Sequence, residues 1–130
     1  MNKFGILGYG YVGKATHKGL LNDEKSIVHD ITFNTEREIL KDADTIFVCI
    51  PTATQTDITI VISEIQLIQE FNPTATFIIR STLPLGACQE IQAEVGSIIY
   101  IPEFLRERYW DTDCFKRPLV VGCDNELPQW

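Results

Sequence analysis

Basic residues are scarce in this chain of 130 residues, where 11 Lys and Arg face 18 Asp and Glu for a formal net charge of −7 at pH 7. The densest basic stretches, residues 106–108 and 116–117, are too short to bind a polyanion such as nucleic acid. No segment has the roughly 20 consecutive apolar residues that span a membrane. Residues 1–4 lead directly into an apolar run and leave no room for a signal peptide, so we expect a cytoplasmic protein.

Cysteine is also sparse, and its spacing does not suggest cross-linking. The four residues, Cys49, Cys88, Cys114 and Cys123, contain no C-x-x-C pair. Free thiols are therefore favoured over disulfides, and no metal site is predicted. The hydrophobic fraction of 45% and the charged fraction of 22% are those of an ordinary globular protein. The length predicts one domain, residues 1–130, with no second domain.

Short apolar runs alternate with amphipathic stretches, which is typical of a parallel sheet with crossover helices. The predicted fold is therefore α/β, Rossmann-like and doubly wound, with a mostly parallel six-stranded sheet. Asn72-Pro73 and Gly96-Ser97 mark the ends of the last two helices. Strands are expected over residues 4–7, 26–29, 45–50, 76–79, 98–101 and 119–121, and helices over 11–21, 35–41, 60–71 and 85–94, with one compact crossover between 30 and 44.

A glycine-rich turn follows the first predicted strand, and an acidic residue, Asp30, ends the second. The spacing Gly8-x-Gly10-x-x-Gly13 with this acid is the fingerprint of a dinucleotide-binding unit. Gly8 permits a tight turn, Gly10 lets the backbone approach a pyrophosphate, and Gly13 lets the helix pack on the strand. Asp30 would accept hydrogen bonds from the adenosine ribose and repel a 2′-phosphate. The pattern therefore favours NAD over NADP.

Two hydroxyl-bearing loops follow other predicted strands, at the sheet edge where doubly wound folds bind ligands. Pro51 and Thr52 begin the first loop, and Ser81 and Thr82 begin the second. Their hydroxyl and N–H groups are candidates for contacts with the ribose and nicotinamide of the cofactor. Plainer alternatives are a proline-punctuated turn with threonine caps in the first loop, and a serine or threonine cap for the next helix in the second.

The segment Pro-Glu-Phe-Leu-Arg-Glu, residues 102–107, follows the fifth predicted strand. Glu103 and Glu107 would share one face if the segment is helical, and two carboxylates at a strand end can act as base and charge stabiliser. Solvated surface glutamates beside arginines are the alternative.

Taken together, these four segments resemble the UDP-glucose/GDP-mannose dehydrogenase family of nucleotide-sugar dehydrogenases. The likeness runs from Phe4 to Gly122 and is most specific in residues 102–107. The segments that carry it are Gly-Tyr-Gly-Tyr-Val-Gly at 8–13, Ile-Pro-Thr-Ala-Thr at 50–54, Ser-Thr-Leu-Pro-Leu-Gly at 81–86 and Pro-Glu-Phe-Leu-Arg-Glu at 102–107.

The resemblance implies a cofactor, a chemistry and a set of site residues. Family members use NAD to oxidise a sugar C6 alcohol to a carboxylate through a thioester on a cysteine. Glu103, helped by Thr82, matches the residue that activates water for thioester hydrolysis, and Glu107 matches a second glutamate near the nicotinamide. Phe104, Leu105 and Arg106 match the stretch along the nucleotide sugar. The cofactor-binding positions carried over are Gly8, Gly10, Tyr11, Val12 and Gly13 at the pyrophosphate, Asp30 at the ribose, and Pro51, Thr52, Ser81 and Thr82 toward the nicotinamide.

Departures from the family pattern leave more than one function open. Ala53 replaces a usual proline, Arg108 replaces an expected glycine, and the family's nucleophilic cysteine loop and nucleotide-binding domain have no counterpart. We therefore expect no activity from the chain alone. It is either the NAD-binding part of a nucleotide-sugar dehydrogenase completed by another polypeptide, or a non-catalytic NAD-binding and regulatory module. A β-hydroxyacid type of reductase is a weaker third reading. Trp110 and residues 127–130 are expected to cover exposed apolar surface, either by folding back on the chain or by pairing two copies, and a homodimer is favoured.

Overall fold

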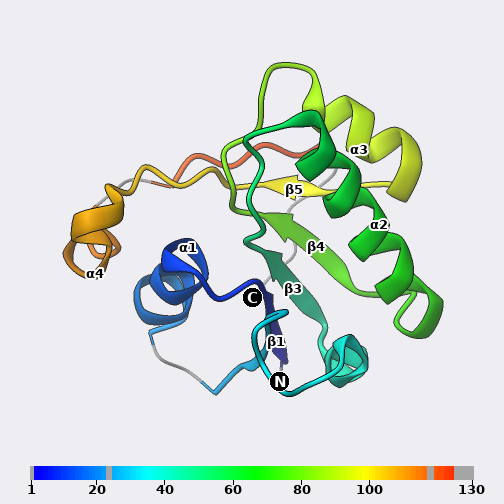
Figure 1. Ribbon diagram of the computed structural model, residues 1–130, viewed down its shortest axis with the longest axis horizontal. Helices are drawn as coiled ribbons and strands as arrows, with labels where there is room; N and C mark the ends of the chain where they lie inside the picture. Colours follow the sequence, from blue (N-terminus) through cyan, green and yellow to red (C-terminus); the bar gives the residue numbers. More distant parts are fainter. Residues whose placement is uncertain (1, 23–24, 117–118, 125–130) are drawn as a thin grey trace.

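The computed structural model describes residues 2–22, 25–116 and 119–124, and its centre is a parallel sheet of five strands in the order β2-β1-β3-β4-β5 (Figure 1). All neighbouring strands in this sheet are parallel, which confirms the Rossmann-like doubly wound fold. Strand order reverses between β1 and β3, and a crevice for ligands opens at such a switch point. The strands are β1 (Phe4–Leu7), β2 (Ile27–His29), β3 (Thr45–Val48), β4 (Thr76–Ile79) and β5 (Ile99–Tyr100).

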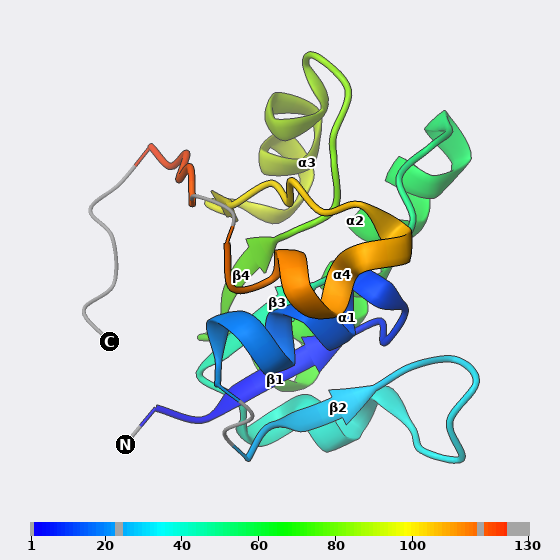
Figure 2. The ribbon, with the colours of Figure 1, turned by 90° about the vertical axis from the view of Figure 1, so that its left-hand side faces the viewer.

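Helices cover both faces of the sheet (Figures 1 and 2). One face carries α1 (Tyr11–Ala15), its continuation η1 (Thr16–Leu20) and α4 (Trp110–Asp113), and the other carries η2 (Arg37–Asp42), α2 (Gln55–Phe71) and α3 (Ala87–Val95). Successive β3 side chains alternate between the layers: Ile46 and Val48 join the core under α2 and α3, while Phe47 joins the core under α1. Burial on both faces explains why the strands read as continuous apolar runs.

Local hydrogen bonds set the ends of α2. The helix starts earlier than predicted because Thr54 caps it: the Asp57 N–H donates to Thr54 Oγ1 (3.2 Å), and the Thr54 N–H donates to Asp57 Oδ2 (2.9 Å). It ends at Phe71, before Asn72-Pro73, as predicted. The buried Asn72 amide then donates to the carbonyls of Leu40 (3.0 Å) and Ala43 (2.8 Å) and ties α2 to η2.

The predicted sixth strand over 119–121 is wrong. Among residues 119–124, only Gly122 pairs with the sheet edge, through two hydrogen bonds to Tyr100 in an isolated antiparallel bridge. The edge of β5 offers no further outward donor, because Pro102 has no N–H and the Ile98 N–H is taken by the Gln92 side chain (3.5 Å). A ladder beyond this one bridge would therefore lack hydrogen-bond donors from the edge of β5.

The helices predicted over residues 11–21 and 35–41 are only partly α-helical or not α-helical at all. Residues 11–21 begin as an α-helix and continue as the π-helix η1, in which the Leu21 N–H donates to the Thr16 carbonyl (3.0 Å). Gly19 in η1 lies against Cys114, so closely that a Cβ would come within 2.5 Å of the Cys114 carbonyl oxygen. Residues 35–41 form no α-helix, and the short 3₁₀-helix η2 makes the compact crossover expected there.

Candidate dinucleotide site

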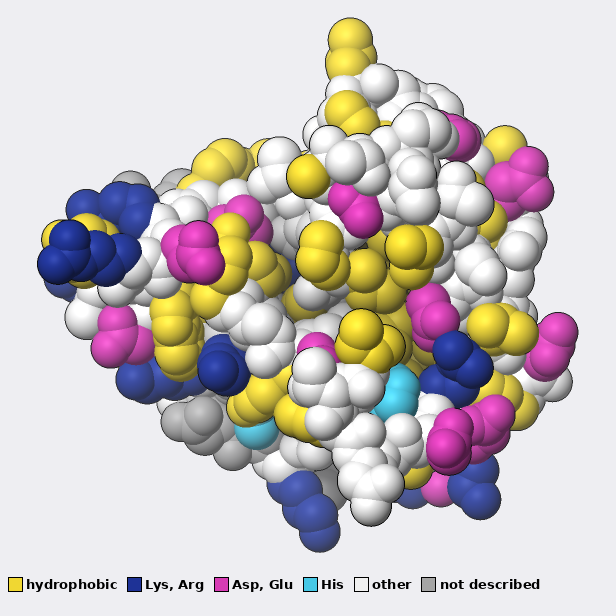
Figure 3. All heavy atoms as spheres, viewed as in Figure 1, with side chains coloured by type: hydrophobic (Ala, Val, Ile, Leu, Met, Phe, Trp, Pro, Cys, Tyr) yellow, Lys and Arg dark blue, Asp and Glu magenta, His cyan; other side chains and the backbone are white. Residues whose placement is uncertain are grey.

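A cavity of about 920 Å³ lies at the carboxyl ends of the strands, around the switch point between β1 and β3. Figure 3 shows a hollow near the middle of this face of the molecule, with hydrophobic side chains on its floor. Gly13 and Glu107 lie outside the cavity wall. Its lining includes the other predicted site residues: Gly8, Gly10, Tyr11, Val12, Asp30, Pro51, Thr52, Ser81, Thr82 and Glu103.

The three glycines of the turn differ in what surrounds them. Gly8 has a φ of +95°, and a Cβ there would lie 2.7 Å from the Cys49 carbonyl oxygen. A Cβ on Gly13 would lie 2.0 Å from the Gly8 carbonyl oxygen, so only glycine allows this close packing of α1. A Cβ on Gly10 would meet nothing within 4 Å. The space beside Gly10 is therefore open to the cavity, and the turn fits a phosphate group against bare backbone.

Asp30 is held in place at the end of β2 by three hydrogen bonds. Its Oδ2 accepts the Tyr9 N–H at 2.7 Å, and its Oδ1 accepts the N–H (2.9 Å) and the hydroxyl (2.7 Å) of Thr32. The Tyr9 bond, followed by the Thr32 N–H, lowers the Asp30 pKa below its usual value. The cavity thus contains a fixed, ionised carboxylate beside the glycine turn.

Hydroxyl groups link the loops that follow β3, β4 and β5. Thr52 donates its hydroxyl to the Thr82 carbonyl, Ser81 donates to the Ile50 carbonyl (2.5 Å), and Thr82 donates to Glu103 Oε1 (3.3 Å). The helix α3 is capped by Gly86, without a side-chain bond, so neither Ser81 nor Thr82 caps it. Because the hydrogen of each of these hydroxyl groups is used, each oxygen can act toward a ligand only as a hydrogen-bond acceptor.

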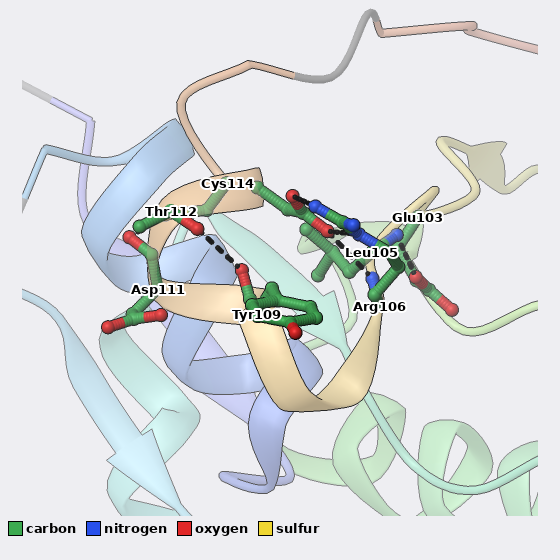
Figure 4. Close-up of polar contacts among 8 residues, drawn as sticks. Glu103, Leu105, Arg106, Tyr109, Asp111, Thr112 and Cys114 are labelled. Atoms are coloured by element: carbon green, nitrogen blue, oxygen red, sulfur yellow. Dashed lines mark hydrogen bonds and ion pairs between the residues drawn. The ribbon is translucent and has the colours of Figure 1, made fainter.

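The segment after β5 is not helical until Glu107, so the condition under which Glu103 and Glu107 would share one helix face is not met. Glu103 Oε2 instead accepts the Leu105 N–H (2.7 Å), and the Arg106 N–H donates to Asp113 (3.0 Å) (Figure 4). The Arg106 guanidinium also donates two hydrogen bonds to the Asp113 carboxylate, from Nε to Oδ2 at 2.9 Å and from Nη2 to Oδ1 at 2.8 Å. These bonds occupy the backbone N–H groups that a helix would need.

Both glutamates nevertheless approach the phenol of Tyr11, the first residue of α1. Partial burial raises the Tyr11 pKa above its usual value, and the negative charges of Glu103 and then Glu107 raise it further. Glu107 begins the short helix η3 (Glu107–Tyr109), with an exposed side chain. The structure therefore brings the two carboxylates to one end of the glycine turn from different local conformations.

Sequence reasoning missed four polar residues of the cavity wall: His29, Thr32, Asp57 and Glu64. His29, buried before Asp30, pairs its Nδ1 with the Thr35 hydroxyl at 2.9 Å. Glu64 on α2 accepts two bonds from Arg37, at 3.0 and 2.8 Å. A polar residue at the buried end of a strand is a usable signal for His29. No local pattern connects Arg37 with Glu64, because the two lie on separate elements.

Residues 18–128 match the sequence profile described as "UDP-glucose/GDP-mannose dehydrogenase family, NAD binding domain". The chain belongs to this family. Its cofactor is accordingly NAD. The profile match begins after the glycine turn, whose geometry supports the same cofactor independently.

Two individual proteins extend the comparison. UDP-glucose 6-dehydrogenase from Streptococcus pneumoniae is 32% identical over 94 residues, which are 66% of this chain and 24% of that enzyme. This chain therefore matches about a quarter of the length of the relative. The crystal structure of a pilus assembly-related protein from Burkholderia pseudomallei superposes with a TM-score of 0.53 at 12% identity, covering 87% of this chain and 86% of the other. At that identity the likeness concerns the fold alone.

Three further observations concern the described residues. None of the four cysteines, which all lie in the described part of the chain, forms a disulfide. Within residues 2–22, 25–116 and 119–124, no group of three or more His, Cys, Asp or Glu side chains is placed to hold a metal ion. None of the helices in the described part of the chain has the length and apolar character needed to cross a membrane.

Proposed function

We propose that the 920 Å³ cavity is where this domain holds NAD, with the pyrophosphate at the turn formed by Gly8, Gly10 and Gly13. The adenosine ribose would be held by Asp30, and the nicotinamide end by the loops that carry Thr52 and Thr82. The observation that carries this proposal is the open space beside Gly10, next to a fixed ionised carboxylate. Bound NAD would supply the hydride acceptor.

We further propose that the domain serves a nucleotide-sugar dehydrogenase whose remaining parts lie outside this chain. The support is the family membership, together with the contact between Thr82 and Glu103 at the predicted nicotinamide end. Glu103 would act as general base toward water, and Thr82 would orient its carboxylate. Glu107 would add negative charge near Tyr11. The backbone of Phe104, Leu105 and Arg106 would run along a nucleotide sugar, and a homodimer is part of the same proposal.

A calorimetric titration with NAD tests the cofactor site. Wild-type chain should bind NAD, and Gly10→Val should abolish binding, because the new side chain fills the space where a phosphate approaches the backbone. Circular dichroism should show that Gly10→Val keeps its fold, since no atom stands in the way of the added group. Gly122→Ala is the matched control, because its Cβ would meet nothing closer than 3.8 Å. Normal NAD binding by Gly10→Val would overturn the proposed pyrophosphate position.

A non-catalytic NAD-binding module is the second candidate function. The raised pKa values of two cysteine thiols, Cys49 and Cys88, favour it for the isolated chain. Thioester formation needs a thiolate, but burial raises the pKa of Cys49 to about 12 and also raises the pKa of Cys88. We therefore expect no NADH when the purified chain is mixed with NAD and UDP-glucose, as followed by NADH absorbance. Steady NADH formation would contradict the non-catalytic function and would make Cys114 the candidate nucleophile.

A further inference from the structure

A second cavity, of about 240 Å³, lies on the opposite side of Glu103 from the hydroxyl-bearing loops, between η1 and the segment after β5. Most of the residues around it have apolar side chains, among them Leu20, Leu105 and Phe115, while polar and apolar atoms contribute about equally to its surface. One cationic side chain, Arg80, reaches this cavity from the end of β4. A pocket that places a guanidinium beside apolar side chains can select ligands by charge and by apolar surface together.

The Arg80 guanidinium is buried without a matching negative charge. The residue is only 6% exposed. Its Nε donates to the Thr16 hydroxyl at 3.3 Å and its Nη1 to the Ile101 carbonyl at 3.2 Å, and both acceptors are neutral. Across the described part of the chain Arg80 forms no ion pair. Burial lowers the Arg80 pKa, but a guanidinium stays charged at neutral pH, and a buried charge is normally paired.

The nearest titratable groups that the structure describes form no ion pair with Arg80. Cys49 stays a neutral thiol, since burial raises its pKa to about 12. Glu103 also lines this cavity, but its two carboxylate oxygens accept bonds from the Thr82 hydroxyl and the Leu105 N–H. Its charge acts on Arg80 from a distance and raises the Arg80 pKa against the larger effect of burial, but no hydrogen bond or ion pair joins the two side chains in the described part of the chain.

We propose that this second cavity binds a small organic anion with an apolar body. A carboxylate would pair with Arg80 through the guanidinium fork, and the hydrocarbon part would lie along Leu20, Leu105 and Phe115. A cavity of about 150 Å³ accommodates benzene, so 240 Å³ is enough for a ring or a short chain with one carboxylate. Inorganic phosphate fits less well, because it would leave the apolar walls unfilled.

Nuclear magnetic resonance titration of the ¹⁵N-labelled chain tests the proposal with hexanoate, hexanol and inorganic phosphate as probes. Hexanoate should shift the amide signals of Leu20, Leu105 and Phe115 in a saturable way. Hexanol has the same body without the charge and should bind at least roughly tenfold more weakly. Phosphate should produce no saturable change at these amides. This comparison uses wild-type protein and does not depend on any variant folding.

Substitutions then test whether Arg80 is the cation that pairs with the hexanoate carboxylate. Arg80→Met should lose the preference for hexanoate over hexanol, and Arg80→Lys should keep part of it, since a cation remains without the planar fork. Arg37→Met is the matched control, because Arg37 is bonded to Glu64 and lines neither cavity, and it should bind hexanoate like wild type.

Three results would overturn the proposal: no saturable hexanoate shift, equal binding of hexanoate and hexanol, or shifts centred on Gly10 and Thr52 instead of Leu105 and Phe115. NAD added to a separate sample should shift Gly10 and Asp30. The NAD titration tests the proposed cofactor site independently of Arg80. A negative result for the hexanoate site can therefore be distinguished from a negative result for the NAD site.

Discussion

At the scale of the residue, we propose that Asp30 decides which dinucleotide the cavity accepts. The Tyr9 and Thr32 bonds fix the carboxylate and hold it ionised. Asp30→Asn keeps the size of the side chain and removes the charge. We expect this variant to lose NAD affinity and to raise the affinity for NADP relative to NAD by roughly tenfold, because juxtaposed like charges cost several kcal/mol.

Calorimetric titration of each variant with both dinucleotides measures this change. Asp111→Asn is the control, since Asp111 is exposed on α4 and lies outside the cavity wall. Equal affinity of the wild-type chain for NAD and NADP would remove Asp30 from the role assigned to it.

Single residues also show where prediction from sequence stops. The spacing of Gly8, Gly10 and Gly13 predicted three physical roles, and the structure bears out the packing roles because short-range sterics at a strand-to-helix turn depend on local sequence. The turn at Asn72 was predicted from the following proline alone. Its two bonds to Leu40 and Ala43 were not predictable, since they join residues that meet only when α2 packs beside η2.

At the scale of the element, the first turn of α2 depends on the capping box of Thr54 and Asp57. Thr54→Ala should lower the free energy of unfolding by about 1 kcal/mol, because the Asp57 N–H loses its acceptor. Chemical denaturation measures this loss. Thr59→Ala, on an exposed position inside the same helix, should be neutral or slightly stabilising, since alanine has the higher helix propensity. Equal destabilisation by both variants would contradict the capping argument.

Elements buried on both sides were the most predictable from sequence. β1 and β4 have the predicted bounds, because each is a complete apolar run between turn signals. The run at 119–121 looked the same but forms no strand, since strand formation also requires free donors on the neighbouring edge, which Pro102 and Ile98 do not provide. Apolar periodicity likewise could not distinguish an α-helix from the π-helix η1, in which the Leu21 N–H donates to the Thr16 carbonyl five residues earlier.

At the scale of the whole molecule, the candidate site is assembled from every strand end. The sequence placed four functional segments after strands, and parallel order alone brings those ends to one edge. The links from Thr52 to Thr82 and from Thr82 to Glu103 are contacts between separate loops, which no local pattern specifies. The same holds for the second cavity, because Arg80 is unremarkable in sequence and becomes a buried cation only when the segment after β5 covers it.

The predicted self-association depends on which apolar side chains the folded chain leaves exposed. Residues 127–130, one predicted contact, lie outside the described residues, and Trp110, the other, has the Lys18 amine 5.9 Å from its ring centre. Val120 and Val121, beside the short sheet edge at β5, are 54% and 41% exposed. Adjacent exposed apolar residues of this kind mark interaction surfaces.

We expect the chain to form a homodimer whose proportion rises with concentration, as measured by light scattering over a dilution series. Val120→Asp should shift the equilibrium toward monomer, because pairing would bury the new charge. Leu85→Asp is the control: Leu85 is fully exposed on the loop before α3, away from this edge, and its replacement should leave the equilibrium unchanged. A wild-type chain that stays monomeric at every concentration, or a dimer that tolerates Val120→Asp and dissociates with Leu85→Asp, would show that the surface at 120–121 does not mediate pairing.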